Sequence, residues 1–311
     1  MNGEERIASL FSRIVGDWRV QVNFPLANLT TFRIGGPAAY VVTPSHINEL
    51  KEIMAVCREY DLKSLVLGKG SNILASDEGF QGVIIRLDSD FRKVRFQDLI
   101  VEAECGVTLS ALAKMLAEKG LGGLEFASGI PGTLGGAVYM NAGAYGGEMK
   151  DIIQEVTVVD MLGKIKHLDR SELQLGYRSS ILQRKSWIVI KAILQMEKKD
   201  PALIKERMRE LAEQRNAKQP VEMPSAGSVF KRPEGHYVGP MIEQAGLKGY
   251  QVGGAMVSPK HAGFIVNAGG ATCQDVLQLI RVIQKKIKEQ FQVELIPEIR
   301  YLTPRGLDVI R

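Results

Sequence analysis

The sequence has no long apolar run and few cysteines, and both absences exclude classes of protein. No stretch approaches the roughly 18 to 20 apolar residues that a transmembrane helix needs. The N-terminus carries Glu4 and Glu5 in an amphipathic pattern instead of a basic region followed by an apolar core, so we expect no secretory signal and a cytoplasmic protein. Cys57, Cys105 and Cys273 are odd in number and far apart, which predicts buried free thiols and no metal site.

No strongly one-signed charge is present either. Of 311 residues, 45% are apolar and 24% charged, as in ordinary globular proteins, and the length allows two or three domains. The net charge is only +5, and the basic residues are spread among acids, so we expect no nucleic-acid partner and no membrane partner. A small anionic ligand accounts for the modest excess equally well.

Glycine, in contrast, is concentrated in one stretch, residues 128–149, which holds seven glycines between Gly129 and Gly147. Glycine allows positive φ and lets backbone N–H groups approach a ligand, and successive N–H groups make an anion-binding concavity. A set of tight turns between strands is the simpler interpretation. The stretch also carries residues 137–140, which read as strand-like, and its length favours a large ligand lying against it.

Hydrophobic periodicity predicts a mixed α+β chain. We expect helices at 5–18, 45–60, 109–119, 201–217, 241–245 and 272–291, and strands at 39–42, 64–67, 83–87, 94–96, 99–103, 154–160, 164–168 and 187–196. Acids and bases alternate in the helix at 201–217, so we interpret it as a solvated connector. Residues 39–72 resemble a nucleotide-binding βαβ unit, but the glycine loop follows the second strand and no G-x-G-x-x-G opens a helix.

Six motifs, taken together and in order, resemble one family. They are GKGSN at 68–72, GIPGTLGGAVYMNAGAYGGE at 129–148, YRSS at 177–180, SAGSVFKRP at 225–233, HAGFIVN at 261–267 and PEIR at 297–300. The chain is therefore similar, over nearly its whole length, to the UDP-N-acetylenolpyruvoylglucosamine reductases, also called UDP-N-acetylmuramate dehydrogenases.

The resemblance implies an α+β architecture with a vanillyl-alcohol-oxidase type FAD-binding fold of two subdomains and a separate α+β substrate-binding domain. We place the first subdomain at 1–87, with residues 302–311 returning to it, the second at 88–218, and the substrate domain at 219–301. Neither glycine segment contains His or Cys, so FAD is expected to be non-covalent. The residues assigned to FAD are Gly68, Lys69, Gly70, Ser71, Asn72, Gly129, Pro131, Gly132, Thr133, Gly135, Gly136, Ala137, Asn141, Gly143, Ala144 and Tyr145. Of these, Asn72 and Asn141 are expected to anchor either turns or the cofactor.

The implied activity is the NADPH-dependent reduction of UDP-N-acetylglucosamine enolpyruvate to UDP-N-acetylmuramate for peptidoglycan synthesis, by hydride from flavin N5 to the vinyl carbon and then protonation. By resemblance, Arg178 and Glu298 act at the substrate carboxylate, where a fixed cation stabilises developing charge. Ser228 is the proton donor. Read alone, Arg178 is an ordinary surface arginine and Ser228 a turn serine.

The residues assigned to the substrate follow the same motifs. Arginine and lysine bind phosphate, and two basic residues directly follow SAGSVF, so they are candidates for the diphosphate. The full set is Tyr177, Lys231, Arg232, Tyr237, Gln244 and His261. A structural role for His261 is an equal alternative.

One departure places the chain in the shorter branch of the family. The longer branch inserts a tyrosine-bearing loop after the YR motif, whereas only residues 179–186 separate Arg178 from the strand at 187. Substrate closure is then expected from movement of the last domain. We expect a monomer or weak dimer. A flavin oxidase of the same fold and a non-catalytic nucleotide-sugar binding module are the alternative functions.

Overall fold

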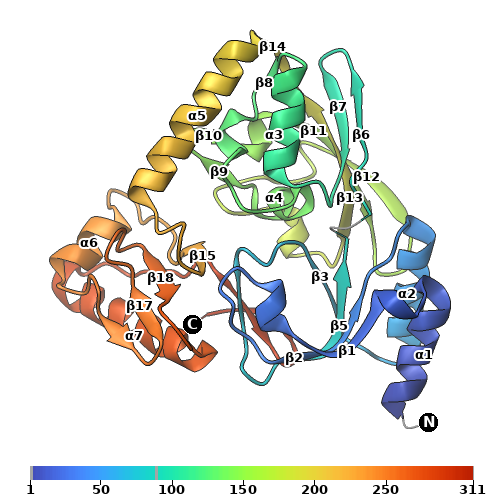
Figure 1. The fold of residues 1–311 in the computed structure, drawn as a ribbon, viewed down its shortest axis with the longest axis horizontal. Helices are drawn as coiled ribbons and strands as arrows, with labels where there is room; N and C mark the ends of the chain where they lie inside the picture. The colour runs from blue at the N-terminus through green and yellow to red at the C-terminus, as the bar shows by residue number, and fades with distance from the viewer. Residues whose placement is uncertain (1–2, 88–89, 311) are drawn as a thin grey trace. The chain divides into compact units, whose positions relative to one another are not determined.

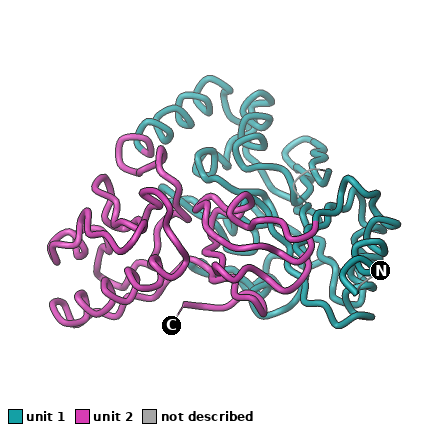
Figure 2. Tube along the Cα trace, turned by 60° about the horizontal axis from the view of Figure 1, so that its bottom comes forward, with its two compact units in different colours: residues 1–21, 41–69, 84–214 teal, residues 22–40, 70–83, 215–311 magenta. Residues whose placement is uncertain are grey.

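The computed structural model describes residues 3–87 and 90–310, which form two compact units (Figures 1 and 2). The first unit comprises residues 1–21, 41–69 and 84–214, and the second comprises 22–40, 70–83 and 215–311. Neither unit is one continuous stretch of chain. The subdomain boundary predicted between 87 and 88 falls beside residues 88 and 89, which lie outside the described residues.

The first unit is built around a five-stranded antiparallel sheet of order β12-β11-β13-β7-β6. Its strands are β6 (Val94–Gln97), β7 (Ile100–Glu104), β11 (Ile153–Val159), β12 (Ile165–Asp169) and β13 (Ile188–Gln195). All five were predicted to within a few residues, because each alternates or runs apolar between turn signals. The short strands β8 (Leu121–Gly122) and β14 (Glu197–Lys198) pair separately.

Helices of the first unit follow their capping signals. In α3 (Leu109–Glu118), Thr108 Oγ1 accepts the N–H of Ala111 at 3.3 Å. Helix α1 (Gly3–Val15) was predicted to continue to residue 18, but Gly16 adopts φ +88° and ends it, and a short 3₁₀ helix η1 (Asp17–Arg19) follows. The remaining helices are α2 (Ile47–Glu59), α4 (Leu134–Met140) and α5 (Pro201–Lys218).

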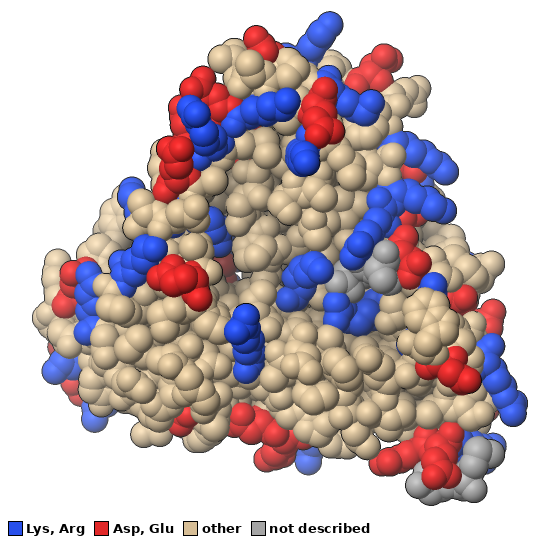
Figure 3. Space-filling view, in the orientation of Figure 1, with Lys and Arg blue, Asp and Glu red and all other residues tan. Residues whose placement is uncertain are grey.

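Helix α5 is a solvated connector, as predicted. Only Ile204 and Leu211 of its side chains are buried, and Arg209 pairs with Glu206 and Glu213 along the exposed surface. Figure 3 shows basic and acidic side chains interspersed along this helix. Such exposed pairs contribute little stability, so α5 is held mainly by its few apolar contacts and its ends.

A four-stranded sheet of order β1-β2-β5-β3 includes segments of both units. Its strands are β1 (Val20–Pro25), β2 (Pro37–Val42), β3 (Ser64–Leu67) and β5 (Phe80–Arg86). Strands β1, β2 and β5 each begin in one unit and end in the other. The chain therefore changes unit three times within regular strands, and also between residues 69 and 70 in the GKGSN loop and between 214 and 215 within α5.

The second unit combines an antiparallel sheet of order β15-β18-β17-β16 with helices α6 (Val238–Gln244) and α7 (Cys273–Phe291). The strands are β15 (Ser225–Ser228), β16 (Gln251–Val252), β17 (Ala255–Val257) and β18 (Phe264–Asn267). Helix α7 packs on β16 and β17, and its apolar stripe forms much of the buried core of this unit. The predicted stripe residues Val276, Leu279, Ile280, Ile283 and Ile287 are all fully buried.

A second sheet of this unit joins distant parts of the sequence. Strand β19 (Arg300–Thr303) pairs in parallel with β4 (Ile73–Ala75) and antiparallel with β20 (Gly306–Val309). Asp77, just after β4, accepts the N–H groups of Cys273 and Gln274 at the start of α7, at 2.8 and 3.1 Å. A carboxylate at this position satisfies otherwise unpaired amides and favours the helix dipole.

The prediction of free, buried cysteines is confirmed, since all three are free and buried. Burial raises the pKa of the Cys57 and Cys273 thiols to about 12, so neither forms a thiolate near neutral pH. Among the helices within 3–87 and 90–310, none combines the length and apolar character needed to cross a bilayer.

Candidate functional site

The long glycine stretch forms a short helix followed by a hairpin. Residues 137–140, expected to be strand-like, lie instead in α4, where Leu134, Ala137 and Val138 are buried. The helix forms because the small residues at its start allow close packing: a Cβ on Gly135 would lie 3.0 Å from Cys105 Cβ. Strands β9 (Gly143–Ala144) and β10 (Gly147–Glu148) then pair antiparallel.

Two amides at the start of α4 are already used by the protein. Leu134 N–H donates to Val107 O and Gly135 N–H donates to Cys105 O, both at 2.8 Å. These bonds leave neither N–H to donate to a phosphate. Of the amides expected to face FAD, the one at Gly135 therefore has a structural role.

One glycine in each predicted cofactor segment is required by packing within the first unit. A Cβ on Gly68 would lie 2.5 Å from Thr133 Oγ1, and one on Gly147 would lie 2.7 Å from the Phe126 ring. Real Cβ atoms do not approach other atoms so closely, so these positions admit only glycine without a shift of the neighbour. Their glycines fix the two predicted cofactor segments against the rest of this unit.

Two other glycines leave space beside the backbone. A Cβ on Gly136 would have Thr133 Oγ1 at 3.8 Å as its nearest contact, and one on Gly146, where φ is +88°, would meet no described atom within 4 Å. The backbone at these positions is open to a ligand. The residues present thus fit a large cofactor lying along α4 and the hairpin.

Asn141 joins the glycine stretch to the YRSS loop. It is fully buried with φ +43°, and its Nδ2 donates to Glu148 Oε2 at 2.7 Å and to Gly176 O at 2.9 Å. Its Oδ1 accepts Lys150 N–H at 2.8 Å. Both of its amide hydrogens are thereby used, so the side chain anchors these turns.

Arg178 lies against the hairpin in the same unit. Its Nη2 donates to Gly143 O at 2.8 Å, and its guanidinium lies 5.3 Å from the Tyr177 ring centroid. The residue has φ +51°, which is uncommon for a side-chain-bearing residue, and Gln183 Nε2 donates to both Arg178 O and Tyr139 O at 3.0 Å. The structure therefore brings Arg178 to the glycine stretch.

The end of the GKGSN loop, residues 70–72, belongs to the second unit and has its own requirement for glycine. Gly70 has φ +59°, and a Cβ there would lie 2.2 Å from Leu29 O. At the end of the loop, Asn72 O accepts Arg300 N–H at 2.9 Å, and Asn72 Nδ2 donates to Glu298 O at 3.3 Å. The loop is thus bonded to the PEIR segment.

Ser228 and Glu298 come together through the backbone. Glu298 N–H donates to the carbonyl of Val229, the residue after Ser228, at 2.7 Å. Ser228 ends β15 opposite Phe264 of β18, and its side chain is exposed. The predicted proton donor and the predicted acid therefore lie on adjoining backbone segments of one unit.

His261 lies on the β18 side of Ser228. Its Nδ1 accepts Gly263 N–H at 3.1 Å, and its ring meets Phe264 edge to face at 5.1 Å. Burial lowers the pKa of His261, so the ring is neutral at pH 7, with its proton on Nε2 because Nδ1 is an acceptor. A Cβ on Gly263 would lie 3.0 Å from His261 Cε1 and 3.8 Å from Ser228 Oγ, so both side chains border this glycine.

The two basic residues Lys231 and Arg232 are held in different ways, the first by its backbone and the second by its side chain. Lys231 N–H donates to Ile296 O at 2.8 Å, which holds that backbone. Arg232 stacks over the Tyr237 ring at 3.9 Å, and its Nε donates to His236 O at 3.2 Å. Gln244 is exposed at the last position of α6. The structure brings Arg232 and Tyr237 together.

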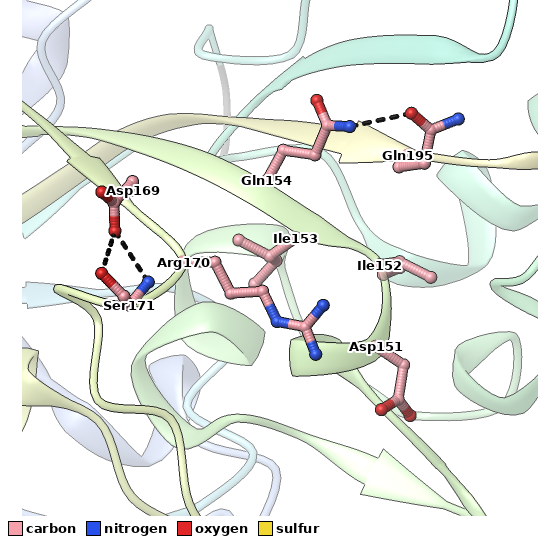
Figure 4. A pocket seen from close by; sticks show the side chains of 8 residues that line it. All are labelled: Asp151, Ile152, Ile153, Gln154, Asp169, Arg170, Ser171 and Gln195. Atoms are coloured by element: carbon pink, nitrogen blue, oxygen red, sulfur yellow. Dashed lines mark hydrogen bonds between the residues drawn. The ribbon is translucent and has the colours of Figure 1, made fainter.

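Residues 3–87 and 90–310 contain no cluster of three or more His, Cys, Asp or Glu side chains able to hold a metal. A cavity of about 430 Å³ in the first unit is lined by none of the predicted residues (Figure 4). There Asp169 binds Ser171 and Gln154 binds Gln195, while Arg170 points over Ile153 toward Asp151. Its polar groups are largely used within the protein.

Sequence reasoning missed the residues that brace the predicted site. Ser180 Oγ donates to Tyr139 O at 2.7 Å, and Gln183 and Glu148 make the contacts described above. Ser180 is buried, although it stands in the quoted YRSS motif. Its place in the YRSS motif was the one signal in the sequence, because its partner is a main-chain carbonyl that no motif identifies.

Comparison with known proteins gives a consistent result over the chain. The sequence model described as the UDP-N-acetylenolpyruvoylglucosamine reductase C-terminal domain matches residues 219–302, and an FAD binding domain matches residues 38–169. The chain is 47% identical over 296 residues to the UDP-N-acetylenolpyruvoylglucosamine reductase of Caldanaerobacter subterraneus subsp. tengcongensis, covering 95% of this chain and 98% of that one.

Solved structures agree with the sequence comparison. The UDP-N-acetylenolpyruvylglucosamine reductase (MurB) from Thermus caldophilus is 37% identical, with a TM-score of 0.77 over 91% of this chain and 97% of that one. p-Cresol methylhydroxylase is 14% identical with a TM-score of 0.50, over 93% of this chain and 65% of that one, which shows likeness of fold alone. The predicted vanillyl-alcohol-oxidase type FAD fold is thereby confirmed.

Proposed function

Because the chain belongs to the family of the UDP-N-acetylenolpyruvoylglucosamine reductases, we propose that it reduces UDP-N-acetylglucosamine enolpyruvate to UDP-N-acetylmuramate with NADPH, as an FAD enzyme of peptidoglycan precursor synthesis. The 47% identity over 95% of the chain carries this conclusion. When bound, FAD supplies the means of passing a hydride from NADPH to the vinyl carbon of the substrate. The remaining work belongs to the side chains of this protein.

The two glycine segments hold the cofactor. The open backbone at Gly136 and Gly146 supports this role, because nothing in the described chain fills the space that a side chain would take there. Gly68, Gly70 and Gly147 act indirectly, since packing requires them to be glycine. Asn141 holds the stretch in shape through its three hydrogen bonds.

Arg178 and Glu298 stabilise charge on the substrate carboxylate. Hydride addition to the vinyl carbon places negative charge on the neighbouring carbon and on that carboxylate, so a fixed cation and an acid there lower the barrier. The bond from Arg178 Nη2 to Gly143 O supports this role, because it holds the guanidinium in one orientation before substrate arrives. Asn72 does the same for the Glu298 backbone.

Ser228 donates the proton that completes the reaction. Its Oγ–H bond breaks as the new C–H bond forms at the carbon next to the hydride acceptor, and the proton is later replaced from solvent. Exposure of the Ser228 side chain supports contact with a ligand. The neutral His261 nearby is suited to donate from Nε2 to a substrate oxygen.

Substrate phosphate is the proposed partner of Lys231 and Arg232. Stacking on Tyr237 and the bond to His236 O pre-orient the Arg232 guanidinium, which lowers the entropy lost on binding an anion. Tyr177 and Gln244 complete the proposed substrate contacts. Their exposure is compatible with that role.

We also propose three domains, at 1–87, 88–218 and 219–301, with residues 302–311 returning to the first. The match of the C-terminal family domain to residues 219–302 and the pairing of β19 with β4 support this division.

Free buried cysteines favour a reducing, cytoplasmic compartment. We propose a monomer or weak dimer, to be tested by light scattering.

An anaerobic spectral titration tests the proposed function. Purified protein with FAD should bleach on addition of NADPH and recover its absorbance only when the enolpyruvyl nucleotide is added. Ser228→Ala should bleach normally and recover about 10²–10⁴-fold more slowly. Loss of bleaching in that variant would contradict the role of Ser228, and rapid recovery with air alone, with peroxide released, would indicate an oxidase instead.

A further inference from the structure

Arg300 has a buried donor with no partner. In the described part of the chain, two buried side-chain atoms lack a hydrogen-bond partner, Arg300 Nε and Gln219 Oε1. The amide of Gln219 is neutral, whereas the guanidinium of Arg300 carries a positive charge. Leaving a charged group's N–H buried and unpaired is costly, so native proteins pair such groups with protein, water or ligand.

The side chain of Arg300 lies on the strand face away from the core of its unit. Arg300 opens β19, and its neighbours Ile299 and Tyr301 both pack into the α7 core. Since side chains alternate along a strand, Arg300 lies on the opposite face, beside its register partner Ile73. On that face Ile73 and Leu302 are buried and apolar, so neither of them satisfies the buried Nε–H of Arg300.

Its backbone neighbours are the two predicted site segments. Arg300 N–H donates to Asn72 O at 2.9 Å, and Asn72 Nδ2 donates to Glu298 O. Arg300 is thus bonded directly to the end of the GKGSN loop and stands two residues after the proposed catalytic acid. A ligand bound by the GKGSN loop and by Glu298 can supply the acceptor for the Nε–H of Arg300.

We propose that Arg300 is a further ligand-binding residue, whose Nε–H donates to a carbonyl, carboxylate or phosphate oxygen of the bound flavin or of the nucleotide substrate. The inference rests on the proposed function for the identity of the two ligands. Guanidinium donates and never accepts, so the partner is an oxygen or nitrogen acceptor, and a negatively charged one binds most strongly. No substrate role was assigned to Arg300 from the sequence.

Binding measurements on two variants and one control test this inference. Arg300→Gln removes the charge, and Arg300→Lys keeps it but cannot place a donor where Nε lies. Arg305→Gln is the matched control, because Arg305 is exposed in the turn between β19 and β20. FAD affinity of the apoprotein is measured by flavin fluorescence, and affinity of the FAD-loaded protein for UDP-N-acetylmuramate by calorimetry, with melting curves for each protein.

Arg300→Gln should weaken one of the two affinities about 10- to 100-fold, and Arg300→Lys at least about fivefold, while Arg305→Gln changes neither. A loss confined to FAD assigns the oxygen to the flavin, and a loss confined to the nucleotide assigns it to the substrate. If Arg300→Gln does not fold, the lysine variant decides. Affinities within twofold of wild type in both arms would overturn the inference.

The proposed function can fail separately. If the wild-type protein bound FAD but consumed no NADPH with the enolpyruvyl nucleotide, the assigned activity would be wrong. The two binding arms would still decide the role of Arg300, since neither requires turnover.

Discussion

Asn72 donates a hydrogen bond from its side-chain amide to the main-chain carbonyl of Glu298, which lies 226 residues later in the sequence. The same asparagine accepts the N–H of Arg300 with its own carbonyl. Two bonds on either side of Ile299 hold the PEIR segment against the GKGSN loop. The backbone of the proposed acid is therefore positioned by a residue that belongs to the predicted cofactor loop.

Replacing Asn72 with alanine tests whether this residue positions Glu298. The change removes the bond to Glu298 O, so we expect a loss of about 1 kcal/mol in the free energy of unfolding. It should also slow reoxidation of the reduced flavin by substrate about tenfold, because Glu298 is less well placed. Stopped-flow reoxidation and urea unfolding measure the two effects, with exposed Asn28→Ala as control. An unchanged reoxidation rate would count against positioning.

Gly136 distinguishes an open cofactor cradle from an ordinary helix. Alanine there meets no atom closer than 3.8 Å in the protein and suits a helix, so Gly136→Ala should stabilise the apoprotein by about 0.5–1 kcal/mol. The added methyl should nevertheless weaken FAD binding at least about tenfold if the cofactor lies against α4. Gly135→Ala, whose Cβ would press on Cys105, should instead destabilise the apoprotein. Unfolding curves and flavin titration compare them; unaltered FAD affinity in Gly136→Ala would place the cofactor elsewhere.

Asn141 should be among the most sensitive positions for stability. Asn141→Ala removes three hydrogen bonds from a buried site and keeps a positive φ, so we expect a loss of about 3 kcal/mol or more. Asn141→Gly loses the same bonds but relieves the strain of the left-handed backbone, and should recover about 1 kcal/mol of that loss. Denaturant unfolding of the two variants measures the difference. Equal stabilities would show that the backbone at this position carries no strain.

His261 should make stability depend on pH. Burial lowers its pKa in the folded protein, so as pH falls below about 6.5 the unfolded chain takes up a proton before the folded one does. The stability due to neutral His261 is therefore complete above that pH and is lost as pH falls through the folded pKa. Between pH 7.5 and 5.5, wild type should lose more stability than His261→Asn, which keeps an acceptor for Gly263 N–H.

The control for this pH dependence is His236→Asn, because His236 is exposed. It should lose stability with falling pH as wild type does. The same slope in all three proteins would exclude His261 as the source.

Long amphipathic elements could be predicted from the sequence, whereas non-local ones could not. The apolar stripe and the Thr272–Asp275 capping box predict helix α7. Apolar runs predict strands β11 and β13. The parallel pairing of β4 with β19 has no local signature, because three- and four-residue strands gain their stability from a partner far along the chain. The division of 22–40 and 70–83 into the second unit follows from such pairings and was not foreseen.

The candidate site shows the same limit. Motifs single out Arg178 and Glu298 as candidates and name Asn72 and Asn141, but they do not predict the main-chain carbonyls that Asn72, Asn141 and Gln183 bind beside these candidates, since a main-chain acceptor carries no sequence information. Helix α4 was misread for a related reason. Its glycines and apolar residues suit several conformations, and contact of Gly135 with Cys105 selects the helix.

The parallel pairing of β4 with β19 also bears on how the protein is made. Residue 73 leaves the ribosome long before residue 300, its register partner. At about 5–20 residues per second, β4 waits on the order of ten seconds or more without its strand partner β19. An unpaired strand can pair with another nascent chain, and synthesis of β19 ends this exposure of β4. Ribosome stalling or truncation just before residue 300 should therefore yield aggregation rather than a smaller folded protein.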